Sequence, residues 1–211
     1  MATRDGGWQV NVEYFPDYVI KTPKTEGEIR EKISRYLSVI GKMEELDKKV
    51  LDMQEGWKEG LNIVASKNLP NEMLGFVEFL PNGKVKQTRV QVLQDVWKEC
   101  IEKGDLNKME KTVEGVIEFI TELWRYGVHE KTFKVGYEFG LMGERIMLID
   151  FGELGTDKEV ARRQLKKKSW NKNLDEHCPR EVGVYFNKVA ELKFTEQVLD
   201  ENWGKYESSS C

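Results

Sequence analysis

The chain has 211 residues, of which 39% are hydrophobic and 33% charged, with a formal net charge of −4 and a sequence pI near 5.5. This composition indicates a globular protein with a solvated surface and gives no general attraction to nucleic acid or membranes. No apolar run approaches the roughly 20 residues that cross a bilayer, and the opening MATRDGGWQ lacks the apolar core of a secretory signal. We therefore expect a cytoplasmic protein, with neither a membrane nor nucleic acid as its partner.

Three cysteines, Cys100, Cys178 and Cys211, are widely spaced and odd in number, which favours reduced thiols over a disulfide framework. With only two histidines, no Cys/His zinc spacing occurs. The chain also lacks a G-x-S-x-G elbow and a G-x-x-x-x-G-K-[ST] loop, so the motifs that usually indicate a hydrolase or a P-loop protein are absent.

The first predicted elements are two strands, residues 8–14 and 18–21, which flank a bend at Phe15-Pro16-Asp17 and can pair as a hairpin. Lys21 ends the second strand. It is either an edge residue that keeps its ammonium in water or a functional cation. The preceding Gly6-Gly7 either lets the backbone approach a phosphate or is slack chain near a terminus.

Two amphipathic helices follow. Thr25 can serve as the N-cap of the first, with Glu28 completing a capping box, and Gly41 is a natural stop. Apolar residues spaced by threes and fours predict the second helix over residues 43–64. Glu26, Glu28 and Glu31 lie near the start of the first helix, where they are either surface carboxylates that favour the helix dipole or, for one of them, a side chain that turns inward.

Residues 75–80 and 85–92 predict a second hairpin around the turn at Asn82-Gly83. Helices are expected over 92–101 and 108–126, and strand signals are absent from there until Arg145. Helical patterns return after Asp157 and over 182–192, residues 199–203 are expected to dock on the helices, and residues 208–211 to fray. The order predicts an α+β protein with a β-rich lobe over 1–90, which holds two helices, and a mainly helical lobe over 91–211.

The stretch RIMLIDFGEL, residues 145–154, is a short apolar strand that runs into an Asp-Phe-Gly turn. Asp150 stands just beyond the strand. A carboxylate there suits Mg2+, which proteins typically hold with one or two carboxylates together with phosphates and water. The alternative is that Asp150 only begins a tight turn, as Asp often does before Gly.

With YVIKTP early and LIDFGEL late, the chain resembles the protein-kinase-like fold, in particular small bacterial and archaeal members with a shortened first lobe and a divergent catalytic loop. The resemblance implies two lobes, a small antiparallel sheet with helices and a mainly helical part, and binding of ATP with Mg2+. Lys21 matches the lysine that holds phosphates. Glu26, Glu28 or Glu31 matches the carboxylate that braces it, and Asp150 matches the metal ligand. Residues 75–92 match the strands that lead to the hinge, with Gln87 among the nucleotide-binding residues.

The resemblance departs in the loop before this strand, where a kinase carries H-R-D-x-x-x-x-N. His129 fits, but the Asp and Asn are absent, and Glu130 and Glu138 are the nearest carboxylates for the catalytic and metal roles. No G-x-G-x-x-G precedes Lys21. Two hypotheses remain open: a phosphotransferase that uses ATP and an unidentified hydroxyl acceptor, or a catalytically degenerate binding or regulatory module with a protein partner.

A basic cluster follows the D-F-G stretch. It either tracks an anionic partner or is the solvated face of an ordinary helix. Its members are Arg162, Arg163, Lys166, Lys167, Lys168 and Lys172, beside Trp170.

Overall fold

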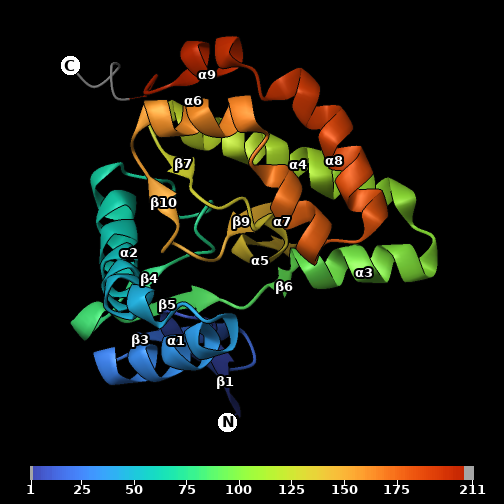
Figure 1. Ribbon diagram of the computed structural model, residues 1–211. Helices are drawn as coiled ribbons and strands as arrows, with labels where there is room; N and C mark the ends of the chain where they lie inside the picture. The colour runs from blue at the N-terminus through green and yellow to red at the C-terminus, as the bar shows by residue number, and fades with distance from the viewer. Residues whose placement is uncertain (1, 207–211) are drawn as a thin grey trace.

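The computed structural model describes residues 2–206, with the backbone alone for residues 2–6. The protein has an α+β fold, and its N-terminal half contains a five-stranded antiparallel sheet in the order β1-β2-β3-β5-β4 (Figure 1). The elements of this half are β1 (Ala2–Gly6), β2 (Val10–Tyr14), β3 (Tyr18–Pro23), α1 (Glu26–Ile40), η1 (Met43–Glu45), α2 (Leu46–Ser66), β4 (Glu78–Phe79), η2 (Pro81–Gly83) and β5 (Val85–Thr88).

The first predicted hairpin is confirmed. Strands β2 and β3 pair antiparallel, and the Phe15 N–H donates to the Tyr18 carbonyl at 2.9 Å to close the bend. Strand β1 was missed, since the Gly6-Gly7 dipeptide was open to interpretation as slack chain. Its backbone pairs with β2 along residues 2–6, so the sheet gains an edge strand from a polar segment without β propensity.

Helix α1 begins and ends as predicted. Thr25 and Glu28 form the capping box, and Gly41 closes the helix in the left-handed region, with φ of 68° and its N–H on the Leu37 carbonyl. The buried residues of α1 pack on Val50 of α2 and form a small apolar cluster of their own, separate from the main core. Helix α2 follows η1 and packs against α1 (Figure 1).

The second hairpin is present but shorter than predicted. The turn uses Asn82 and Gly83, both with positive φ, and β4 holds only two residues. Strand β5 ends at Thr88, whose N–H bonds the Gly75 carbonyl. The next strand, β6 (Gln91–Val92), leaves this sheet and pairs with β8. The predicted strand 85–92 is therefore two strands that serve different sheets.

The second half is mainly helical and is built around α4, which packs against α3, α8 and α9 (Figure 1). Its two small antiparallel sheets have the orders β6-β8-β9 and β10-β7. The elements are α3 (Leu93–Lys103), α4 (Leu106–Arg125), β7 (His129–Glu130), α5 (Val135–Glu138), β8 (Phe139–Met142), β9 (Arg145–Leu148), β10 (Leu154–Gly155), α6 (Lys158–Lys167), α7 (Trp170–His177), α8 (Arg180–Lys193) and α9 (Glu196–Asn202).

Strands β7 and β8 differ from the prediction that strand signals are absent before Arg145. Strand β8 pairs with β9 and carries Gly140 opposite Met147, and β7 is a two-residue pairing with the distant β10. The predicted helices, by contrast, are found as α3, α4, α6 and α8, and Leu199 of α9 is fully buried against the core. Helix α7 was not predicted.

The basic cluster is the solvated face of helices. Arg162 bonds both Glu196 and Asp200 of α9, while Lys166, Lys168 and Lys172 each pair with a glutamate. The charge of the cluster is thus largely matched by acidic neighbours on the same surface.

The main apolar core runs through both halves, and Val85 and Leu93 are both fully buried in it. The boundary near residue 90 stays a prediction. Cys100 and Cys178 are free thiols, whereas Cys211 and the segment 208–211 lie outside the described residues. Within residues 2–206, none of the helices has the length and apolar character needed to cross a membrane.

Candidate functional site

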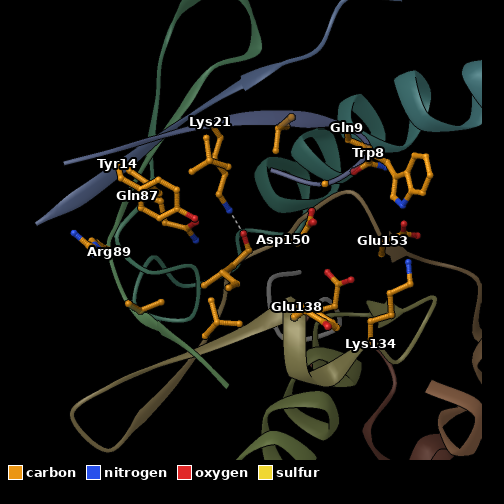
Figure 2. A pocket seen from close by; sticks show the side chains of 18 of the residues that line it. Trp8, Gln9, Tyr14, Lys21, Gln87, Arg89, Lys134, Glu138, Asp150 and Glu153 are labelled. Carbon is orange, nitrogen blue, oxygen red and sulfur yellow. Dashed lines mark hydrogen bonds between the residues drawn. The ribbon is translucent and has the colours of Figure 1, made fainter. Parts of the chain in front are cut away.

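A cavity of about 470 Å3 lies between the sheet and the second half of the chain. Strands β2, β3 and β5 line one side, and residues from α5 and from the turn after β9 line the other (Figure 2). In Figure 2, Tyr14, Gln87 and Arg89 lie at one end of the cavity, Lys134 and Glu153 at the other, and Lys21 and Asp150 between them.

Lys21 stands in β3, the central strand of the sheet, and is only 8% exposed. The interpretation as an edge residue in water is therefore wrong. Its ammonium donates a hydrogen bond to the Ile149 carbonyl and lies 5.6 Å from the centre of the Phe151 ring. Burial lowers the pKa of Lys21, and the nearby carboxylates of Asp150 and Glu138 oppose that shift. A buried cation thus faces the cavity from the sheet.

Asp150 follows β9 and takes part in the turn, which is one of the two interpretations that the sequence left open. Its Oδ1 accepts a hydrogen bond from the Gly152 N–H at 3.1 Å, which shapes the turn, and its side chain also lines the cavity. The Asp150 N–H and the Ile149 N–H both donate to the Glu138 carbonyl, at 3.3 and 2.7 Å. These two bonds tie the turn to α5, so the carboxylates of Asp150 and Glu138 face one space.

Glu138 is 3% exposed, and its Oε2 has no hydrogen-bond partner. Burial raises the pKa of Glu138 well above its usual value, and the negative charge of Asp150 raises it further. Within residues 2–206, no group of three or more Asp, Glu, His or Cys side chains is arranged to hold a metal ion. Two carboxylates with an unpartnered buried oxygen nevertheless fit Mg2+, which takes its remaining ligands from phosphate and water.

Glu130 is not brought into the cavity. Its carboxylate accepts hydrogen bonds from the Thr132 N–H at 2.7 Å, the Thr132 hydroxyl at 2.8 Å and the Phe133 N–H, and it is 1% exposed. Burial raises its pKa to about 7. The adjacent His129 is also buried, and burial lowers its pKa. The structure thus differs from the prediction of a catalytic Glu130, because this carboxylate folds its own loop.

The helix glutamates do not reach Lys21 either. Glu28 accepts from the Thr25 N–H and hydroxyl, both at 2.8 Å, and from Asn11 at 2.9 Å on the surface. Glu26 pairs with Arg30, and Glu31 with Arg35, in helical i, i+4 pairs. All three candidates for the bracing carboxylate are engaged on α1, and the Ile149 carbonyl is the group that holds the lysine.

Gln87 lies in β5 and lines the cavity with 1% of its surface exposed. Its amide nitrogen donates to the Leu74 carbonyl at 2.6 Å and to the Leu148 carbonyl at 2.9 Å. The side chain therefore links β5 to β9 at this end of the cavity. Beyond it, Thr88, Arg89 and Val90 also line the cavity as the chain leaves the sheet.

Helix α2 holds the Asp150 turn by close backbone contact. A Cβ atom at Gly60 would overlap the Phe151 carbonyl, and one at Gly56 would lie 3.0 Å from the Gly152 carbonyl oxygen. Gln9, which is 7% exposed and lies in the turn between β1 and β2, packs directly on Gly152. The turn is thus positioned by two glycines that lie four residues apart on one face of α2. In the sequence, these glycines are visible as interruptions of the apolar stripe of the helix.

Sequence reasoning missed Lys134 and Glu153, which line the cavity from opposite sides of its acidic end (Figure 2). Glu153 belongs to the quoted D-F-G-E-L stretch, three residues after Asp150, and that closeness could have identified it. Lys134 and Gln9 carry no comparable signal, because their places depend on how loops pack.

Comparison with known protein families gave no match for this chain, and comparison with curated proteins gave none.

Proposed function

We propose that the chain has a two-lobed, protein-kinase-like fold and binds ATP with Mg2+ in the cavity between its two halves. The observation that carries the proposal is that Lys21 and Asp150, far apart in the sequence, line one cavity together with the buried carboxylate of Glu138. A cation on the sheet and paired carboxylates opposite it are the groups that hold nucleotide phosphates and their metal ion.

In this proposal, the base lies at the end near Gln87 and Arg89, against the valines of the sheet. Val12 and Val19 line the cavity as apolar surfaces, and the chain beyond Gln87 runs along it. The phosphates lie between Lys21 and the turn. Lys21 then exchanges its bond to the Ile149 carbonyl for phosphate oxygens, which compensates the cost of burying its ammonium.

Asp150 and Glu138 are the residues that would hold Mg2+. When bound, Mg2+ neutralises charge on the phosphates. The unpartnered Glu138 oxygen supports this assignment, because a buried acceptor without a donor costs roughly 1–3 kcal/mol unless a ligand satisfies it.

Thermal unfolding with Mg-ATP tests the proposal. A ligand at 100 times its Kd stabilises by about 2.7 kcal/mol, which for a chain of this size raises Tm by roughly 5–10 °C. Asp150→Asn should remove the magnesium dependence of that rise. Asp95→Asn, at an exposed position of α3 outside the cavity, should leave it intact. Absence of any rise at millimolar Mg-ATP would overturn the proposal.

A second candidate is a kinase-like module that binds nucleotide and regulates a protein partner without transferring phosphate. The observation that favours it is the engagement of Glu130 by Thr132 and Phe133, outside the cavity. Turnover of radiolabelled ATP separates the candidates: binding without turnover supports the module, and binding with turnover supports a phosphotransferase.

A further inference from the structure

The acidic end of the cavity holds a carboxylate that the candidate roles above leave unused. Glu153 lines the cavity, and Figure 2 shows its side chain on the far side of Asp150 from Tyr14 and Arg89, with the Lys134 amine directed toward it. Its backbone is fixed, because the Lys131 N–H donates to the Glu153 carbonyl at 2.7 Å and the next residues pair with β7. The side chain therefore projects from a well-held position.

Within the described residues, Glu153 differs from Glu130 and Asp150 in that its carboxylate makes no hydrogen bond. It differs from Glu138 in having no proposed metal-binding role. Glu130 accepts three hydrogen bonds in its own loop, and Asp150 accepts one from the turn. For Glu153, no side-chain hydrogen bond or ion pair is found within residues 2–206. Burial raises its pKa, an effect that Lys134 opposes, and a raised pKa makes a carboxylate a better proton acceptor near neutral pH.

We propose that Glu153 orients the hydroxyl of the phosphate acceptor and takes its proton, with Lys134 beside the terminal phosphate of the nucleotide. This inference rests on the proposed ATP site. In this role, Glu153 provides a carboxylate from the turn after β9. The loop after β7 does not provide one, because Glu130 points inward.

The acceptor oxygen forms a bond to the γ-phosphorus as the bond from that phosphorus to the β–γ bridging oxygen breaks. The bridging oxygen keeps the electron pair and leaves on ADP. The acceptor proton passes to the Glu153 carboxylate and then to water. Lys134 and Lys21 offset negative charge on the transferring group from either side.

Glu153→Gln tests this role, with hydrolysis of Mg-ATP by water as the probe reaction. Removing a general base typically costs 10²–10⁴-fold, so we expect the hydrolysis rate to fall by about that factor. Glu144→Gln is the matched control: it makes the same change at an exposed residue of the β8–β9 turn and should turn over like the wild type.

Binding provides a readout that does not depend on turnover. A carboxylate that faces the terminal phosphate repels it, so Glu153→Gln should bind Mg-ATP as tightly as the wild type or severalfold more tightly, with ADP affinity unchanged. A metal ligand or a structural residue would instead lose affinity for both nucleotides. If Glu153→Gln fails to fold, Glu153→Asp keeps the charge and is expected to retain partial turnover and full binding.

The outcomes separate the two proposals. If the wild type does not bind Mg-ATP, the proposed function fails. If it binds Mg-ATP but shows no hydrolysis, or if Glu153→Gln hydrolyses ATP at the wild-type rate, the role of Glu153 is overturned while the nucleotide site stands. Weakened binding of both nucleotides in Glu153→Gln also overturns it.

Discussion

Two acidic loops lie side by side in this molecule and use their carboxylates in opposite ways. The loop after β7 turns Glu130 inward onto the N–H groups of Thr132 and Phe133. The turn after β9 directs Asp150 and Glu153 toward the cavity. The bond from the Lys131 N–H to the Glu153 carbonyl joins the two loops.

The difference lies in where each loop finds its hydrogen-bond donors. The first satisfies the Glu130 carboxylate from within the loop, with the N–H groups of Thr132 and Phe133 and the Thr132 hydroxyl. The turn offers one N–H, that of Gly152, to the Asp150 carboxylate and none to Glu153, and it is packed from outside by the glycines of α2 and by Gln9. Both carboxylates line the cavity. The type of residue at a position therefore does not decide whether a carboxylate supports the fold or meets a ligand, whereas the supply of nearby donors does.

The largest effect is expected when the packing of α2 on the turn after β9 is disrupted. Gly60→Ala places a methyl group against the Phe151 carbonyl, and because backbone lies on both sides, relief requires the helix or the turn to shift. We expect a loss of about 3 kcal/mol in unfolding free energy and no Tm response to Mg-ATP, measured by thermal unfolding.

The matched control for that prediction is Gly27→Ala in α1, where a Cβ meets no other atom within 4 Å. It should stabilise the protein slightly, by up to about 1 kcal/mol, because alanine favours a helix over glycine. Equal effects of the two substitutions would contradict close packing of α2 on the turn.

The buried Glu130 carboxylate makes the stability of the protein depend on pH. The pKa of Glu130 is about 7 in the fold, against an ordinary value of 4.5, so the folded state binds this proton more tightly. The stabilisation is complete below about pH 4.5 and is lost as pH rises through about 7, a change of about 3 kcal/mol. Glu130→Gln should remove this part of the decline in unfolding free energy between pH 5 and 8. Denaturant unfolding of wild type and variant at several pH values measures the difference. Parallel curves for wild type and variant would show that Glu130 does not titrate in this range.

Lys21→Met removes the cation that faces the turn while keeping a side chain of similar length. We expect the Tm of the free protein to stay the same or rise, because burial of the ammonium is unfavourable, as its lowered pKa indicates. The Tm response to Mg-ATP should disappear. A fall in Tm of the free protein would instead mean that the bond to the Ile149 carbonyl supports the fold.

The smallest effect is expected on α1. Glu28→Ala removes one partner of the capping box and should cost less than about 1 kcal/mol, or roughly 2–4 °C in Tm. Nucleotide binding should be unchanged because Glu28 lies away from the cavity. Loss of binding in Glu28→Ala would show that a glutamate of α1 reaches Lys21 when nucleotide is present.

Local signals in the sequence predicted the elements that are specified by residues close to one another in the chain. The capping box at Thr25, the turn at Asn82-Gly83 and the apolar stripe of α4 each act within a few residues. Strand β1 was missed because its residues are mostly polar, although its partner β2 is adjacent in the sequence. Strand β7 has two residues and is defined by a distant partner, with Leu154 opposite Glu130. Strand β8 is four residues long and pairs with the distant β6 as well as with the adjacent β9.

The same contrast applies to the candidate site. Lys21 follows an apolar pair within β3, and Asp150 stands just beyond β9; both patterns are visible in the sequence, and both residues line the cavity. The direction of the Glu130 side chain depends on two N–H groups within its loop, which no residue pattern reveals. The places of Lys134, Glu153 and Gln9 depend on loop packing, which only the structure supplies.

The small apolar cluster of α1 has a consequence for local unfolding. Since Ile29, Ile33 and Leu37 pack on Val50 and not on the main core, α1 can open without exposing that core. Trp57 of α2 belongs to the main core and stacks on Phe151, so opening of α1 leaves the Asp150 turn supported. Amide protons of α1 should therefore exchange with solvent by a lower-energy opening than those of α4, while the turn exchanges with the cooperative unit formed by the main core.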